Sequence, residues 1–128
     1  MSHPSTNQLI TFLTTDKFEE TIKFVEEMLG FPLALEKAHC RIYRIAPHAY
    51  VALCKSDKPM PDAKRVTVSI QSNDIDGWYE RVKSHGLETD GEPRWSEQYG
   101  IYHFFSWDPN GYSWEFQEFR LDEWDHDA

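Results

Sequence analysis

Hydrophobic residues near the start of the chain follow first a strand pattern and then a helix pattern. Residues 8–14 are apolar and include β-branched side chains, which predicts a strand. The next apolar positions recur at helical spacing, on one face of a helix. These positions are Phe18, Ile22, Val25 and Leu29. Gly30 follows them directly, and a glycine there is typical of a helix C-terminus.

Three short strand-like runs follow this first helix. They cover residues 31–36, 40–46 and 49–55 and are separated by short polar or proline-containing turns. The first half of the chain therefore predicts the element order βαβββ. Residues 56–64 contain two prolines and no apolar periodicity, which indicates a connector.

The same order of elements begins again after the connector. Residues 65–72 alternate apolar and polar side chains, as a strand with one buried face does. A second helical spacing then joins Ile75, Trp78, Tyr79 and Val82. Gly86 closes this helix, and a looser extended stretch follows at residues 87–95. The chain therefore contains an internal repeat of architecture.

Two aromatic strands are predicted at the end of the second half. They cover residues 101–107 and 112–119, and residues 108–111 (DPNG) between them are a strong signal for a hairpin turn. Alternation assigns Trp114 and Phe116 to the core that faces the helix. Two helical patterns among about eight strands disfavour a parallel α/β sheet. The sequence thus predicts an α+β fold whose two βαβββ modules form a curved mixed sheet with the helices on its outer face.

Charge and aromatic content narrow the possible functions. The 128 residues include 22 acidic and 13 basic side chains, with a net charge of −9 at pH 7. Such a chain repels nucleic-acid phosphates and anionic membranes and favours cationic ligands. The chain also contains five Trp, six Tyr and eight Phe, many of them in the last third, where acidic residues are also concentrated. No nucleic-acid or membrane partner is expected.

The expected location follows from what the chain lacks. Residues 1–8 contain no basic region followed by an apolar run, and the chain has no apolar stretch of membrane-spanning length, so a cytoplasmic location is expected. Cys40 and Cys54 lie within predicted strands and have no metal-ligand spacing. Two reduced packing residues are therefore the simpler interpretation.

Three motifs, together with their order along the chain, resemble those of the vicinal oxygen chelate superfamily. They are residues 24–31 (FVEEMLGF), 74–76 (DID) and 108–116 (DPNGYSWEF). The superfamily includes glyoxalase I, extradiol dioxygenases, fosfomycin-modifying enzymes and bleomycin-resistance proteins. The resemblance extends over roughly residues 8–119 and implies paired βαβββ modules around a concave cavity, in a homodimer.

The resemblance also implies how the chain is divided. It implies that residues 1–128 form a single domain of this superfamily. Its parts are module one at about 8–55, a linker at 56–64, module two at about 65–119 and an acidic tail at 120–128.

Family enzymes hold a divalent metal with histidines and carboxylates from several strands. Counting from the shared motifs puts the first ligand position at Leu9 or Ile10 and the second at Thr67, none of which binds a transition metal well. Residues 49–55 offer no carboxylate or imidazole, so Glu115 alone matches a family ligand. A catalytic site needs about three protein ligands. The resemblance therefore favours binding over catalysis, and no cofactor is expected.

The register of the last hairpin decides which side chains lie beside Glu115. If the turn pairs Trp107 with Tyr112, then Tyr102 and Phe104 share the cavity face with Glu115. A slip of one residue would reverse this arrangement. The expected ligand-binding residues are Thr67, Trp95, Tyr102, Phe104, Glu115 and Gln117.

Three functions remain open at this point. The first is a protein of the bleomycin-resistance type that sequesters an aromatic, cationic small molecule between aromatic walls, with Glu115 as the anion. The resemblance associates this type with antibiotic resistance. The second is a divergent metal-dependent lyase, isomerase, glyoxalase or dioxygenase that uses Glu115, with His103 as a helper although the expected register points it away. The third is a dimeric scaffold whose cavity is filled by its own side chains.

Overall fold

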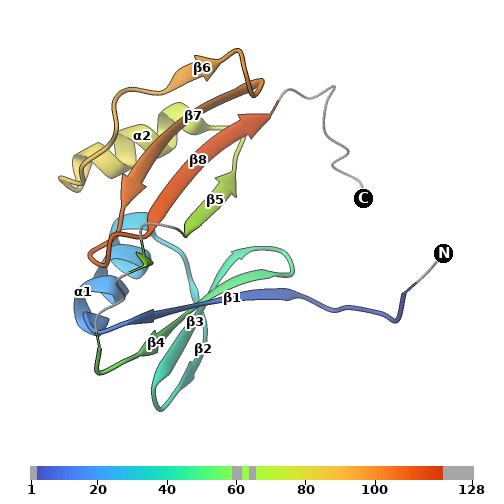
Figure 1. Ribbon diagram of the computed structural model, residues 1–128, viewed down its shortest axis with the longest axis vertical. Coiled ribbons are helices and arrows are strands. Elements are labelled where there is room, and N and C mark those ends of the chain that lie inside the picture. The colour runs from blue at the N-terminus through green and yellow to red at the C-terminus, as the bar shows by residue number, and fades with distance from the viewer. Residues whose placement is uncertain (1–2, 59–61, 64–65, 120–128) are drawn as a thin grey trace. The chain divides into compact units, whose positions relative to one another are not determined.

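The computed structural model describes residues 3–58, 62–63 and 66–119, which belong to two compact units (Figure 1). The first unit is Met1–Met60 and the second is Pro61–Ala128. The expected acidic tail at 120–128 and part of the expected linker lie outside the described residues. The grouping of both units into one domain stays a prediction.

The first unit contains one four-stranded mixed sheet and one helical segment. The sheet order is β1-β4-β3-β2, with β1 parallel to β4 and the other neighbours antiparallel. The elements are β1 (Leu9–Thr15), α1 (Phe18–Ile22), the π-helix η1 (Lys23–Leu29), β2 (Leu33–Lys37), β3 (Cys40–Ala46) and β4 (Ala49–Lys55).

Gly30 ends the helical segment of this unit, as its position predicts. Its φ of 86° lies in the left-handed region, which a glycine adopts without the steric cost of a Cβ atom. Its N–H donates to the carbonyl of Val25 at 3.1 Å, a bond that spans five residues and is typical of a π-helix.

One face of the first sheet packs against the helical segment. The hydroxyl of the fully buried Tyr43 on β3 donates to Oε2 of Glu26 on η1 at 2.7 Å, and Arg41 donates to the same oxygen at 3.3 Å. Burial, together with this carboxylate, raises the pKa of Tyr43 well above its ordinary value. The buried apolar residues of the unit include Leu13, Phe24, Val25, Leu29, Val51 and Leu53.

The second unit repeats the strand order of the first. Its sheet order is β5-β8-β7-β6, with β5 parallel to β8 and the other neighbours antiparallel. The elements are β5 (Thr67–Gln71), α2 (Ile75–Ser84), β6 (Arg94–Ser96), β7 (Ile101–Trp107) and β8 (Ser113–Phe119). Each unit thus has one mixed sheet of four strands, with one helical segment between the first and second strands in chain order. This arrangement confirms the predicted α+β class and the two βαβββ modules.

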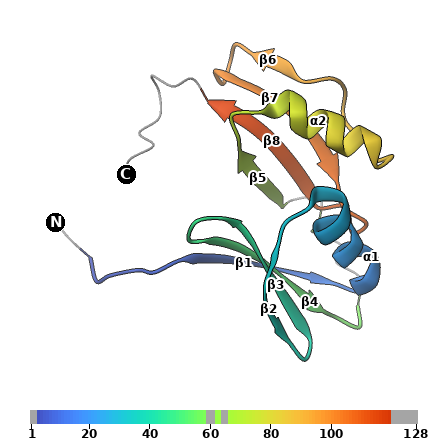
Figure 2. The same cartoon turned by 180° about the vertical axis from the view of Figure 1, so that it is seen from behind.

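Helix α2 begins at a side-chain cap and lies across one face of the second sheet (Figure 2). Oδ1 of Asp74 accepts a hydrogen bond from the N–H of Gly77 at 3.0 Å and so satisfies one of the free donors of the first turn. None of the helices in the described part of the chain is long and apolar enough to cross a membrane.

Aromatic rings fill the space between α2 and the second sheet. Trp114, Phe104 and Phe116 are fully buried. The ring of Phe116 stacks on Phe104 at 5.1 Å and on Trp78 of α2 at 4.9 Å. The assignment of Trp114 and Phe116 to this core is therefore confirmed.

The turn between β7 and β8 is held together by the buried carboxylate of Asp108. Oδ1 accepts the N–H groups of Asn110 at 2.9 Å and Tyr112 at 3.1 Å, while Oδ2 accepts the indole N–H of Trp114 at 3.1 Å. Burial raises the pKa of Asp108, although these three donors act in the opposite direction. The predicted hairpin turn is present and is anchored to the core through Trp114.

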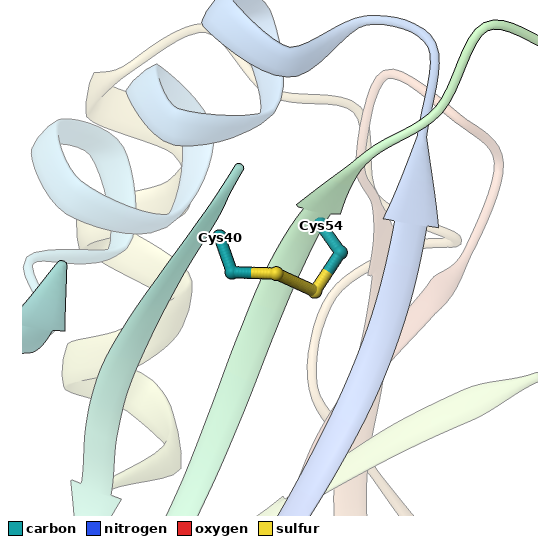
Figure 3. Close-up of a disulfide and its surroundings, with 2 residues drawn as sticks. All are labelled: Cys40 and Cys54. Carbon is teal, nitrogen blue, oxygen red and sulfur yellow. A yellow bond between two sulfur atoms is a disulfide. The ribbon is translucent and has the colours of Figure 1, made fainter. Parts of the chain in front are cut away.

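Cys40 and Cys54 form a disulfide between β3 and β4 (Figure 3). This corrects the expectation of two reduced packing residues. The two cysteines lie directly opposite each other, with Cα atoms 4.3 Å apart, and beside them the N–H of Lys55 donates to the carbonyl of His39 at 2.9 Å. Opposed residues that share no backbone hydrogen bond lie closest in an antiparallel pair. Strand register thus brings together two cysteines that are 14 residues apart in sequence.

Candidate functional site

The last hairpin is shifted by one residue from the expected register. Trp107 pairs with Ser113 instead of Tyr112, and Phe105 lies opposite Glu115. The turn is longer because the Asp108 side chain accepts the N–H of Tyr112, while the N–H of Asp108 donates to the carbonyl of Tyr112 at 3.1 Å, so strand pairing starts at Trp107 and Ser113. The one-residue shift exchanges the two faces of β7 relative to Glu115.

Three of the expected ligand-binding residues therefore lie on the face opposite to Glu115. Phe104 is buried against Phe116 and against Tyr79 of α2, at ring distances of 5.1 and 5.4 Å. Tyr102 shares this face, and Trp95 on β6 pairs with it. The expectation that these residues flank Glu115 is wrong because Phe104 fills the core under α2.

Tyr102 has a structural partner on α2, which leads to a first prediction. Its hydroxyl donates to Oδ1 of Asp76 at 2.6 Å, and this bond, with some burial, raises the pKa of Tyr102 to about 12. Tyr102→Phe is expected to lower the free energy of unfolding by about 0.5–1.5 kcal/mol near pH 8. Because the pKa is raised on folding, the contribution is present below about pH 10 and is lost as the pH rises through 12.

Urea unfolding of the wild type and the Tyr102→Phe variant at both ends of this pH range measures the effect. Ligand binding on the opposite face should not change. An energy difference that is the same at pH 8 and above pH 12 would show that the bond to Asp76 contributes nothing.

Glu115 and His103 form a hydrogen-bonded pair on the face of the second sheet opposite to α2. Nδ1 of His103 lies 2.8 Å from Oε2 of Glu115, and their side chains are 12% and 13% exposed. The pair is diagonal across β7 and β8, because His103 lies opposite Gln117 and Glu115 lies opposite Phe105. The ring of Phe105 packs edge to face against His103 at 5.5 Å.

Strand β5 completes the polar part of this face. The hydroxyl of Ser69 donates to Oε1 of Glu115 at 3.1 Å, and the amide of Gln117 donates to the Ser69 oxygen. Thr67 lies on the same face, two residues along β5 and opposite Ser113. The structure therefore brings Thr67, Glu115 and Gln117 of the expected set to one face of the sheet.

Arg94 brings a positive charge to this face, but another carboxylate neutralises it. Arg94 lies opposite His103 and forms a two-pronged ion pair with Asp90, with Nη1 at 3.0 Å from Oδ1. Burial raises the pKa of Asp90, but the bonds from Arg94 and from the N–H of Phe105 outweigh it, so this pKa lies below its ordinary value. The hydrogen bond from Asp90, and at longer range the charge of Glu115, raise the pKa of Arg94, so among the described residues Glu115 shares this cation with Asp90 and forms no ion pair of its own with it.

A hollow of about 460 Å³ opens over the Glu115–His103 pair. Its size lies in the range of small-molecule sites. We call it the aromatic hollow, because most of its lining is ring and aliphatic surface. Its lining residues are Tyr99, Ile101, His103, Phe105, Glu115, Gln117 and Phe119.

Sequence reasoning named His103 only as a helper in the metal-dependent alternative and placed it on the wrong face. It did not name Ser69 or four residues that line the hollow, Tyr99, Ile101, Phe105 and Phe119. Residues 102–105 are four consecutive ring-bearing side chains, so their pattern does not indicate which face is buried. Ser69 could have been found from the alternation of β5, which places it between Thr67 and Gln71 on the exposed face.

The donors around Glu115 do not match the metal centre of the superfamily. His103 and Glu115 are two possible ligands, and they are hydrogen-bonded to each other. The part of the chain that the structure describes contains no group of three His, Cys, Asp or Glu side chains that could hold a metal ion. Thr67 and Ser69, the β5 residues on this face near Glu115, carry only hydroxyl groups.

Residues 7–116 match the profile of the Glyoxalase/Bleomycin resistance protein/Dioxygenase superfamily. The chain belongs to this superfamily. The family suggested by the three sequence motifs is thereby confirmed. No curated protein matches the chain in sequence.

Solved structures of superfamily members share the fold at low sequence identity. A glyoxalase/bleomycin resistance protein/dioxygenase from Nocardioides is 19% identical with a TM-score of 0.76, over 94% of this chain and 87% of its own. A bleomycin resistance determinant encoded on transposon Tn5 is 20% identical, with a TM-score of 0.74 over 91% and 100%. A bleomycin-binding protein in complex with bleomycin is also 20% identical, with a TM-score of 0.73 over 90% and 100%. At these sequence identities, the similarities show a shared fold and nothing more specific.

Proposed function

We propose that this superfamily member binds a planar aromatic cation in the aromatic hollow and sequesters it without a metal. The observation that carries the proposal is a carboxylate, Glu115, that is 13% exposed and lines a hollow together with the rings of Tyr99, Phe105 and Phe119. Aromatic walls supply apolar contact area and attract cations through their π faces. A buried carboxylate adds orientation and selectivity for positive charge.

The electrostatics of the site favour a cation over an anion. Arg94 is engaged by Asp90, and the groups bound to Glu115 are a hydroxyl and an imidazole. The whole chain carries a net charge of −9, which attracts cations at long range. Bleomycin, which is bound by one structural relative, is therefore included among the test compounds.

The biological setting is part of the same proposal. Sequestration of a toxic aromatic compound would give a role in antibiotic resistance, carried out by a cytoplasmic homodimer. The hollow, together with the lack of a third metal-binding side chain beside Glu115 and His103 among the described residues, supports binding over metal-dependent catalysis.

Glu115→Gln is expected to weaken binding of aromatic cations about 10- to 100-fold, because the charge is lost while the side-chain shape is kept. The probes are 9-aminoacridine, 1-naphthylmethylammonium and bleomycin, followed by intrinsic fluorescence and calorimetry. Affinity for the neutral analogue 1-naphthylmethanol should change little.

Glu118→Gln is the matched control, because it removes the same charge from the neighbouring part of β8. Glu118 lies opposite Tyr102, on the face away from the hollow. Equal loss in both variants would indicate a general charge effect. Absence of saturable binding by every probe at millimolar concentration would refute the proposal.

A further inference from the structure

The two ring nitrogens of His103 have different surroundings. Nδ1 lies 2.8 Å from Oε2 of Glu115. Among the described residues, no hydrogen-bond partner is found for Nε2, and every buried side-chain nitrogen or oxygen atom in that part of the chain has a partner. Nε2 is therefore accessible, and His103 lines the aromatic hollow.

The carboxylate decides which ring nitrogen carries the proton. An ionised Glu115 can only accept hydrogen bonds, so Nδ1 donates to it, and in the neutral imidazole Nε2 is then an acceptor. The second oxygen of Glu115 is held by Ser69 at 3.1 Å, which limits rotation of the carboxylate. The His103–Glu115 pair thus presents Nε2 as a hydrogen-bond acceptor in a fixed direction, and the negative carboxylate lies on the other side of the imidazole ring.

We propose that His103, oriented by Glu115, selects ligands whose cationic group carries an N–H, such as protonated amines and protonated ring nitrogens, over quaternary ammonium ions. This inference rests on the proposed function and names the ligand class of that site. The N–H donates to Nε2, while the charge of Glu115 acts through the imidazole. A quaternary ion has the same charge but no donor, so it leaves the nitrogen acceptor without a partner.

Aromatic contacts alone would give a different preference. The rings of Tyr99, Phe105 and Phe119 interact with any cation over their faces, and such surfaces also recognise quaternary ammonium ions. A difference in affinity between cations with and without an N–H therefore reports the contribution of His103 separately from that of the aromatic walls.

The experiment compares two probes of equal charge and equal ring system: 1-naphthylmethylammonium and its N,N,N-trimethyl analogue. Calorimetry at pH 8 with the full chain is expected to give about tenfold tighter binding of the primary ammonium. In His103→Asn the side chain still has an amide that can donate to Glu115 but lacks an atom in the place of Nε2. The ratio of the two affinities should then fall below about twofold, whatever the change in overall affinity.

A second measurement uses the wild-type protein alone and so does not depend on folding of the variant. The nitrogen NMR signal of Nε2 in His103 should shift on addition of the primary ammonium and much less with the trimethyl probe. Equal affinities and equal shifts for both probes would overturn the inference and leave the proposed function intact. Failure of both probes to bind would overturn the inference, and failure of 9-aminoacridine and bleomycin as well would overturn the proposed function with it.

Discussion

Replacing Phe104 with alanine is expected to lower the free energy of unfolding of the second unit by about 3–5 kcal/mol. Phe104 is fully buried, and its ring packs on Phe116 at 5.1 Å and against Tyr79 at 5.4 Å. Truncation removes these contacts and leaves a cavity between β7 and α2 that the surrounding rings fill incompletely. Urea denaturation followed by far-UV circular dichroism measures the loss.

Phe105→Ala is the matched control, because the two residues are neighbours on one strand with side chains on opposite faces. Phe105 lines the aromatic hollow and is only partly buried, so its loss should cost less than about 2 kcal/mol. It should instead weaken binding of 1-naphthylmethylammonium. The reverse outcome, with Phe104→Ala losing ligand and Phe105→Ala losing stability, would contradict the strand register.

Removal of the Cys40–Cys54 disulfide is expected to lower the free energy of unfolding of the first unit by about 3 kcal/mol. The bond joins residues 14 apart and therefore restricts the unfolded chain by closing a loop of that length. Thermal unfolding of oxidised and reduced wild-type protein gives the size of the effect, and the Cys40→Ala/Cys54→Ala double variant should match the reduced form.

The double variant also provides the control for the reducing agent. Addition of dithiothreitol should lower the Tm of the wild type and leave the Tm of the double variant unchanged. Thiol titration of the denatured, unreduced protein should detect no free cysteine, since the two cysteines are paired. Two free thiols, together with an unchanged Tm on reduction, would contradict the disulfide.

Local signals were sufficient for the order of elements and for most of their ends. The two helical spacings and the glycines that follow them depend on residues within one or two turns of each other, so Gly30 and Gly86 were recognised as helix ends. The aromatic run at 101–107 predicts a strand with the same bounds as β7. Glu115 was found because its motif includes the turn beside it.

Which side chains lie together in the site depends on how β7 pairs with β8, and the sequence alone does not determine this register. The Asp108 carboxylate lengthens the turn by binding the N–H of Tyr112, and this places His103 beside Glu115 and Phe104 in the core. Because Tyr102 to Phe105 carry rings at every position, both registers bury aromatic surface, and packing under α2 selects between them.

The sequence by itself determined the repeated βαβββ order, the superfamily and the acidic character of the chain. Periodicity and motifs depend on residues that are close in sequence, and net charge depends only on how many charged residues there are. Tertiary structure decided the pairing of Cys40 with Cys54 and of His103 with Glu115. Both pairs join different strands, so each depends on a register in which a shift of one residue exchanges the two faces of a strand.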